Sequence, residues 1–182
     1  HRIAFTTMKW ENTALIVVDV QIGLFQRKTP IYNEQQLLEN INSLEKIAHS
    51  NNIPVIYIQH ANKSTLVEGS EKWQLHSQLQ KNASDLLIHK RYPNTFKETN
   101  FREELEARNI TQLIIVGTLT DNCVGATCKG GKELGYEVIL VTDAHSTYSE
   151  PAPEIIKKWH KNLRNQKVIL KSTIEMIEYL KM

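Results

Sequence analysis

Short runs of apolar, mostly β-branched residues constrain the fold of this chain more than any other sequence feature. The run ALIVVDV at positions 14–20 contains one charged residue, Asp19, and the run LIIV at positions 113–116 contains none. Strands that read as continuous apolar runs are buried on both faces, and they occur mainly in parallel sheets covered by helices. The two runs therefore predict central strands of a parallel sheet.

Helical patterns alternate with the strand patterns along the chain. An apolar stripe at helical spacing follows Asn33, a candidate N-cap, and a strand at 55–58 comes next. Further strands are expected at 85–88, 136–141 and 168–170, with helices opening near Asn100, after Cys123, at Pro153 and at Ser172 with Glu175. Strand-helix-strand order implies right-handed parallel crossovers. The sequence therefore predicts an α/β fold: a doubly wound, six-stranded, mainly parallel sheet with helices on both faces.

Length and composition narrow the class of protein. A chain of 182 residues suits one domain, expected over residues 1–182, and a net charge of +2 argues against a nucleic-acid surface. No apolar run reaches membrane-spanning length and the N-terminus lacks a long hydrophobic signal core, so we expect a cytoplasmic protein without nucleic-acid or membrane partners. Cys123 and Cys128 project from different faces of one predicted helix, so both are expected to be free thiols.

Three chemically active side chains follow predicted strands. Asp19 and Lys90 lie at strand ends, and Cys123 lies in the turn beyond another strand. Each has an ordinary explanation as a loop cap, a surface lysine or a small core residue. Open α/β sheets, however, gather their ligands along the carboxyl edge of the sheet. Together a carboxylate, an ammonium and a thiol predict nucleophilic catalysis, because the carboxylate can take the thiol proton and the ammonium can stabilise the resulting anion.

The turn before Cys123 adds to this prediction. Residues 118–120 would form the turn after the strand, and Thr120 or Asp121 could cap the following helix. Cys123 would then lie in the first helical turn, where free backbone amides and the helix dipole favour a thiolate.

These residues resemble three motifs of the isochorismatase-like superfamily of cysteine hydrolases, which includes nicotinamidases and N-carbamoylsarcosine amidohydrolases. The first is a strand ending in VDVQ, at 18–21. The second is the strand-end lysine of IHKRYPNTF, at 88–96, with Phe96 in the place of the family's usual Phe. The third is G-x-x-T-x-x-C-V, at 117–124. The resemblance covers nearly the whole chain, and the three motifs in this order are highly specific.

The resemblance implies that Asp19, Lys90 and Cys123 form a catalytic triad. It also implies a cis peptide bond between Thr118 and Leu119, which costs about 3 kcal/mol for a non-proline residue. This bond would turn the amide of Leu119 beside that of Cys123 to form an oxyanion hole. The implied reaction is hydrolysis of the C–N bond of a small amide, lactam, imide or carbamoyl compound through a thioester, without a cofactor. The resemblance further implies a homo-oligomer, either a dimer or a tetramer.

Departures from the family motifs reduce the number of reactions that we expect. Nicotinamidase members bind zinc through an Asp-x-His at the end of the second strand plus a further His. Here the corresponding stretch at 59–62 reads QHAN, and His76 is the other nearby candidate. Two imidazoles without a carboxylate make a poor zinc site, so we expect no metal. Members that hydrolyse the vinyl ether of isochorismate typically lack the cysteine, so its presence argues against that reaction.

The long stretch at 61–84 has no clear periodicity, and such segments in compact domains are usually functional, disordered or in contact with a partner. It resembles, through EGSEKWQLH at 68–76, a segment of metal-free family members. His60 is either a substrate contact or a histidine satisfied by its loop. The expected substrate pocket comprises Gln21, Phe25, His60, Trp73 and Phe96. Two alternatives stay open: a zinc-assisted nicotinamidase, and a non-catalytic or redox thiol binding module.

Overall fold

The computed structural model of the chain describes residues 10–181. Its strands are β1 (Thr13–Val18), β2 (Val55–His60), β3 (Leu86–Lys90), β4 (Gln112–Thr118), β5 (Glu137–Ser146) and β6 (Ile169–Lys171). Its α-helices are α1 (Glu34–Ser50), α2 (Phe101–Ala107), α3 (Gly125–Glu133), α4 (Ala152–Asn165) and α5 (Thr173–Lys181). Within residues 10–181, none of the helices combines the length and the apolar character needed to cross a bilayer.

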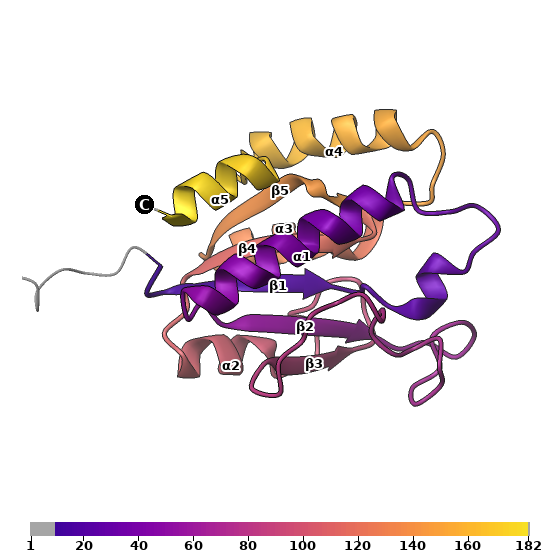
Figure 1. Ribbon diagram of the computed structural model, residues 1–182, viewed down its shortest axis with the longest axis horizontal. Coiled ribbons are helices and arrows are strands. Elements are labelled where there is room, and N and C mark those ends of the chain that lie inside the picture. Colours follow the sequence, from indigo (N-terminus) through magenta and orange to yellow (C-terminus); the bar gives the residue numbers. More distant parts are fainter. Residues whose placement is uncertain (1–9, 182) are drawn as a thin grey trace, which may run out of the picture.

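The strands form one six-stranded sheet in the order β3-β2-β1-β4-β5-β6, and every neighbouring pair is parallel (Figure 1). The predicted six-stranded α/β sheet is therefore confirmed. The chain winds outward from β1 to β3 and then crosses back to β4 on the other side of β1. The winding direction changes between β1 and β4, which is where doubly wound sheets bind ligands at their carboxyl ends.

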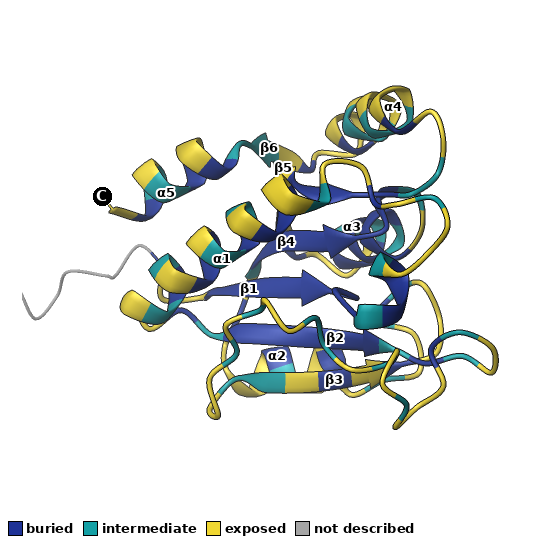
Figure 2. Cartoon of the chain, turned by 45° about the vertical axis from the view of Figure 1, so that its right-hand side comes forward, coloured by how far each residue is buried: buried dark blue, intermediate teal, exposed yellow. Residues whose placement is uncertain are grey.

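Helices cover both faces of the sheet and close two apolar cores. Leu15 and Val17 of β1 belong to the core under α1 and α5. Ile16 and Val18 belong to the core on the other face, together with side chains of α2, α3 and α4. The central strands are buried along their length and the helices expose only their outer faces (Figure 2). Burial on both faces explains why the strands read as unbroken apolar runs.

Strand β5 is longer than its sequence predicts. The prediction ends this strand near Asp143, but the ladder with β4 shifts register between Ile115 and Gly117, and Gly117 pairs with His145. This irregularity lets β5 pass Asp143 and continue to Ser146. The Asp143 carboxylate accepts hydrogen bonds from the amide and hydroxyl of Thr173, at 2.8 and 2.6 Å, where α5 begins.

The helices begin close to the predicted positions, but only some of the predicted capping hydrogen bonds are present. The predicted capping box of α5 is confirmed: the Ser172 amide donates to Glu175 at 2.8 Å, and the Glu175 amide donates to the Ser172 hydroxyl at 3.1 Å. Asn33 and Asn100 do precede α1 and α2, but neither side chain makes a capping hydrogen bond.

The long segment between β2 and β3 is held against the end of β1. Gln21 and Leu75 form an isolated antiparallel bridge, and the His76 amide donates to the Val20 carbonyl at 2.8 Å. The Ile22 amide donates in turn to the Gln74 carbonyl at 3.0 Å. These bonds fix the segment at the carboxyl edge of the sheet, where the strand-end side chains gather.

Candidate active site

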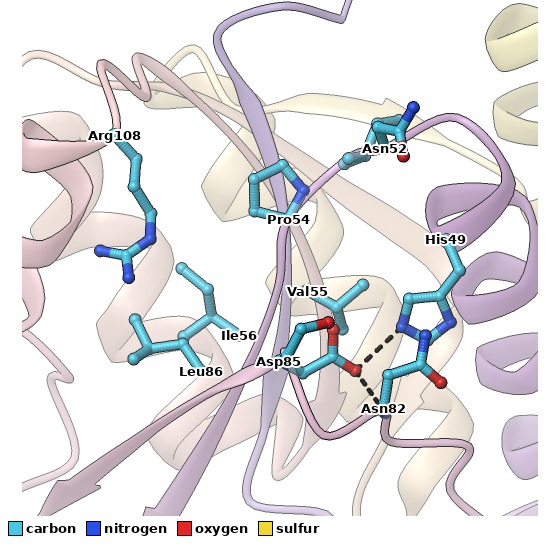
Figure 3. Close-up of a pocket in the computed structure, with 11 residues that line it drawn as sticks. His49, Asn52, Pro54, Val55, Ile56, Asn82, Asp85, Leu86 and Arg108 are labelled. Carbon is cyan, nitrogen blue, oxygen red and sulfur yellow. Dashed lines mark hydrogen bonds and ion pairs between the residues drawn. The ribbon is translucent and has the colours of Figure 1, made fainter.

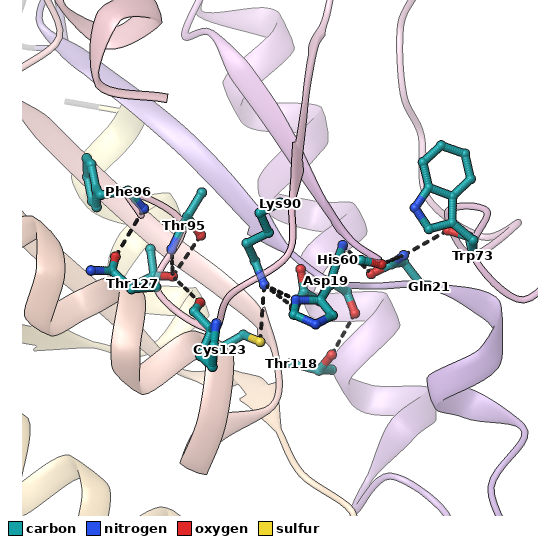
Figure 4. Close-up of polar contacts among 12 residues, drawn as sticks. Asp19, Gln21, His60, Trp73, Lys90, Thr95, Phe96, Thr118, Cys123 and Thr127 are labelled. Atoms are coloured by element: carbon teal, nitrogen blue, oxygen red, sulfur yellow. Dashed lines mark hydrogen bonds and ion pairs between the residues drawn. The ribbon is translucent and has the colours of Figure 1, made fainter. Parts of the chain in front are cut away.

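The carboxyl ends of β1, β3 and β4 bring three predicted side chains together. Asp19 follows β1 directly, Lys90 is the last residue of β3, and Cys123 lies in a π-helical turn, Thr120–Val124, after β4. Lys90 Nζ lies 2.9 Å from Asp19 Oδ2 and 3.2 Å from Cys123 Sγ (Figure 4). Carboxylate, ammonium and thiol thus meet although their residues are far apart in sequence.

The Lys90 ammonium is completely enclosed by acceptors. Its side chain has no exposed surface, and besides Asp19 and Cys123 it donates to His60 Nδ1 at 2.8 Å. An ammonium has three N–H donors, so each one has a partner. A buried lysine is costly unless it is paired and hydrogen-bonded. The alternative interpretation of Lys90 as a surface lysine is therefore wrong.

Asp19 has one bound and one unbound carboxylate oxygen. Oδ2 accepts from Lys90, whereas Oδ1 is buried and has no hydrogen-bond partner within residues 10–181. The Asp19 backbone is fixed by hydrogen bonds from its amide to Ile58 and to its carbonyl from the Thr118 hydroxyl. The carboxylate therefore makes no capping hydrogen bond to the following loop, and Oδ1 is available to accept a proton.

The resting form of Cys123 differs from the sequence expectation of a thiolate. Burial, followed by the Asp19 carboxylate, raises the pKa of the Cys123 thiol, and Lys90 offsets only part of this increase. The thiol is 5% exposed and lies in the turn before α3 rather than in a first α-helical turn. Cys123 is accordingly a neutral thiol at rest, and it needs a base to become a nucleophile.

His60 is both tied to Lys90 and part of the cavity wall. Burial, followed by the Lys90 charge, lowers the pKa of His60, so the imidazole is neutral near pH 7. Because Lys90 donates to Nδ1, the proton of the neutral ring is on Nε2. The two interpretations that the sequence left open, substrate contact and satisfied histidine, are therefore compatible.

A cavity of about 100 Å³ opens beside the Cys123 sulfur. Its lining comes from the ends of β1, β2 and β4, from the long segment after β2 and from the loop after β5. The lining residues are Asp19, Leu24, Arg27, His60, Asn62, Thr65, Leu66, Leu119, Asn122, Cys123 and Tyr148.

Gln21 was expected in the pocket wall but holds backbone instead. Its side chain is buried, donates to the carbonyls of His60 and Trp73 at 3.0 and 2.8 Å, and accepts from the His60 amide at 3.0 Å. All its hydrogen-bonding groups face the end of β2 and the long segment. Gln21 therefore positions His60 and does not line the cavity.

The three predicted aromatic residues also lie outside the cavity lining. Phe25 packs edge-on against His76 with ring centroids 4.8 Å apart, and Trp73 packs against His89 at 5.1 Å. Phe96 packs in the core, 4.7 Å from Phe101. Figure 4 shows Trp73 and Phe96 on opposite sides of the Lys90 cluster. Each ring packs against another ring, and none of the three is among the residues that line this cavity.

The turn between β4 and Cys123 has an unusual backbone. The peptide bond between Thr118 and Leu119 is cis, and Leu119 lines the cavity. Gly117 has a φ of 122°, and a Cβ there would lie 2.1 Å from the Val18 carbonyl oxygen. Only glycine fits this close approach of β4 to β1.

Neither of the predicted caps serves the helix after this turn. The Thr120 hydroxyl bonds His145 Nδ1 at 2.7 Å, and the Asp121 carboxylate accepts from the Thr147 hydroxyl at 2.8 Å. His145 Nε2 in turn lies 2.7 Å from His160 Nε2 on α4. Burial, followed by the neighbouring His160, lowers the pKa of His145 to about 3. The turn is thus held from β5 and α4 by a chain of hydrogen bonds that the sequence did not indicate.

The donors around Lys90 do not suit the zinc that the resemblance implies for nicotinamidases. Within residues 10–181, the one group of at least three potential ligands is Asp19, His60 and Cys123, whose ligand atoms lie within 4.8 Å of one another. All three already accept hydrogen bonds from the Lys90 ammonium, which supplies the positive charge between them. His76 is not in this group, so the residues fit an ammonium and not a metal ion.

Another cavity lies at the opposite, amino-terminal end of β2 and β3 (Figure 3). Its volume is about 390 Å³, and its lining includes the ion pair of His49 with Asp85 at 2.9 Å. The same Asp85 oxygen accepts from the Asn82 amide at 2.7 Å, and among residues 10–181 no cysteine lines this cavity.

Sequence reasoning missed Arg27, Asn122 and Tyr148, all of which line the cavity. Only their position in the sequence could have indicated these residues, because each lies in a segment that follows the carboxyl end of a strand. Asn122 stands directly before the nucleophile candidate in the third motif.

Comparisons with known proteins agree with this architecture. A family model described as the isochorismatase domain matches residues 13–173. Streptothricin hydrolase of Streptomyces noursei is 30% identical, over 78% of this chain and 52% of that protein, so the chain spans about half the length of this relative. Ureidoacrylate amidohydrolase of Acinetobacter baylyi is 28% identical, over 74% of this chain and 70% of that protein. The crystal structure of an isochorismatase family protein, 27% identical, covers 91% of this chain and 100% of its own with a TM-score of 0.85. The chain therefore belongs to the isochorismatase family of hydrolases.

Proposed function

We propose that the protein is a cysteine hydrolase that cleaves the C–N bond of a small amide, lactam, imide or carbamoyl compound through a thioester on Cys123. The observation that carries the proposal is that the two carboxylate oxygens of Asp19 have different hydrogen bonding. Oδ2 is held by Lys90, while Oδ1 is buried without a partner in the described part of the chain. A carboxylate oxygen of Asp19 lies within 4.8 Å of the Cys123 sulfur. General-base activation of a neutral thiol needs a carboxylate oxygen that is free to accept the proton, and Oδ1 supplies one.

In the first half-reaction, Asp19 takes the Cys123 proton and the sulfur attacks the carbonyl carbon of the substrate. The backbone amides of Leu119 and Cys123 stabilise the tetrahedral oxyanion. Asp19 then returns the proton to the nitrogen, the C–N bond breaks, and ammonia or an amine departs. The Lys90 ammonium stabilises the thiolate as it forms, which the raised pKa of the resting thiol makes necessary.

In the second half-reaction, Asp19 takes a proton from water, and the hydroxide attacks the thioester carbonyl. The oxyanion collapses, the C–S bond breaks, and the proton returns to the Cys123 sulfur. His60 keeps its Nε2 proton throughout, because Lys90 occupies Nδ1, and it therefore acts as a hydrogen-bond donor to substrate rather than as a base.

The test is hydrolysis of a panel of small amides, lactams and carbamoyl compounds, followed by ammonia release. The Cys123→Ala variant is expected to lose activity by at least about a thousandfold, as removal of a nucleophile does. Acid-quenched wild-type protein should carry an acyl adduct on the peptide containing Cys123, detected by mass spectrometry.

The matched control is Cys128→Ala, because Cys128 is a fully buried core residue in the same helical segment and does not line the cavity. Cys128→Ala should retain turnover and the adduct. Full activity of Cys123→Ala would refute the mechanism. A reversible, peroxide-dependent change at Cys123 without hydrolysis of any substrate would favour the redox alternative instead.

Three wider expectations stay predictions. We propose that residues 1–182 form one domain, that the enzyme works in the cytoplasm, and that it assembles as a homo-oligomer. The support for one domain is the sheet itself, whose strands contribute to the cores on both of its faces.

A further inference from the structure

Among residues 10–181, Arg27 is the one cationic side chain that lines the cavity beside Cys123. Its guanidinium carbon lies 4.6 Å from the centre of the Tyr148 ring, and Tyr148 lines the same cavity. Stacking on an aromatic face holds a guanidinium in place and leaves its N–H edge available. Among the hydrogen bonds and ion pairs within residues 10–181, none involves the Arg27 side chain.

The other charges around the cavity cancel. Asp19 and Lys90 form an ion pair at 2.9 Å, so their formal charges sum to zero. Apart from Asp19, no acidic side chain of the described part of the chain lines the cavity, and the remaining lining residues besides Arg27 are neutral. The net formal charge around the cavity is therefore +1, and it comes from Arg27. A positive charge at the mouth of a cavity attracts anions, and because Arg27 is exposed, salt screens this attraction.

The walls also limit what such an anion can be. Leu24, Leu66 and Leu119 supply apolar surface, and Asn62 and Asn122 supply amide groups. A volume of about 100 Å³ holds a small acid and not an extended one. Arginine binds planar oxyanions through two parallel hydrogen bonds, and a carboxylate has that geometry.

We propose that Arg27 binds a carboxylate of the substrate, so that this enzyme acts on small amide or carbamoyl acids whose carboxylate lies away from the scissile C–N bond. This inference rests on the proposed function and selects a substrate class within it. Arg27 is then a specificity-determining residue, and its contact is present in the ground state as well as in the transition state. Its loss should therefore raise KM more than it lowers kcat.

The experiment compares matched pairs of substrates by ammonia release. Succinamate is paired with butanamide, and N-carbamoylglycine with ethylurea, so that each pair differs mainly in the carboxylate. For the wild type, kcat/KM is expected to be at least tenfold higher for each acid. Arg27→Gln should lower kcat/KM for the acids about 10- to 100-fold, through KM, and change the neutral members less than about threefold.

Two further variants separate charge at this site from charge in general. Lys28→Gln removes the neighbouring exposed lysine, which does not line the cavity, and should keep the preference for acids. Tyr148→Leu removes the ring on which Arg27 stacks, and it should reduce the preference. Equal losses for acids and neutral amides in Arg27→Gln, or no preference in the wild type, would overturn the inference.

Binding measured without turnover keeps this test separate from the test of the mechanism. Isothermal calorimetry of succinamate should detect binding to Cys123→Ala and at least tenfold weaker binding to Cys123→Ala combined with Arg27→Gln. Equal affinities overturn the role of Arg27 even if the enzyme proves to be an amidase. Hydrolysis of neutral amides that depends on Cys123, without any preference for acids, leaves the proposed function intact and overturns this inference alone.

Discussion

Lys90 Nζ holds together acceptors that come from the ends of three strands. If the ammonium were removed alone, the Asp19 carboxylate would remain buried without a counter-charge. Removing one member of a buried ion pair costs more than replacing both, because the orphaned charge keeps its desolvation penalty. The residue-level prediction is therefore a strong coupling between Asp19 and Lys90 in stability as well as in catalysis.

Lys90→Met is expected to lower the free energy of unfolding by about 3–5 kcal/mol. Combining it with Asp19→Asn should cost less than the sum of the two single substitutions, with a coupling above about 1 kcal/mol, while activity stays absent. Urea denaturation followed by tryptophan fluorescence measures all four proteins. Lys28→Met, at an exposed lysine, should change stability by less than about 0.5 kcal/mol. Additive effects of Asp19→Asn and Lys90→Met would contradict the coupling.

The sequence indicates these strand-end residues more reliably than the pocket wall. Asp19 and Lys90 could be placed because the end of a buried parallel strand has a fixed location at the sheet edge. Gln21 lies only two residues from Asp19, yet its side chain binds the backbone of His60 and Trp73. Loop side chains depend on which neighbouring backbone they meet, and the sequence contains no periodicity that determines this.

At the scale of elements, β5 and α4 are in contact through the imidazoles of His145 and His160. The local sequence pattern does not predict this contact. His145 is reached only because β5 continues past the irregularity in its ladder with β4. Its Nε2 lies 2.7 Å from His160 Nε2, and its Nδ1 bonds the Thr120 hydroxyl. The strands and helices could be predicted from the spacing of apolar residues. This contact depends on a register shift between β4 and β5 that has no signal in the sequence.

Stability is expected to depend on pH through this contact. The pKa of His145 is lowered to about 3 in the folded protein, mainly by burial, so the folded chain stays unprotonated there while the unfolded chain takes up a proton below about pH 6.5. The free energy of unfolding should therefore fall as the pH drops from 6 to 4, by about 1.4 kcal/mol per pH unit from this group. Urea denaturation of wild type and His145→Gln across this range measures the difference in slope. Equal slopes would show that His145 does not titrate in this way.

At the scale of the whole molecule, both cores share the same strands. Leu15 and Ile16 are adjacent in β1 but belong to opposite cores, so neither core can lose its packing while the other keeps a complete sheet. This dependence supports the single domain that the length predicts.

Unfolding is accordingly expected to be one cooperative transition. Trp10 packs in the core under α1, while Trp159 packs against the core on the other face. Two variants test this, one retaining only Trp10 and one retaining only Trp159, with the other two of the three tryptophans replaced by Phe. Each variant should give the same urea midpoint by fluorescence and by far-ultraviolet circular dichroism. Separated midpoints within one variant would indicate two units.

The enclosure of Lys90 has a practical consequence. Among the lysines in residues 10–181, it alone is buried, and all of its N–H groups have acceptors. An acylating reagent such as acetic anhydride needs an unprotonated, solvent-accessible amine, so the folded protein should shield Lys90 while its other described lysines react. The rate at which acetyl-Lys90 appears in a peptide map would therefore measure how often the sheet edge opens spontaneously. This measurement does not require a known ligand.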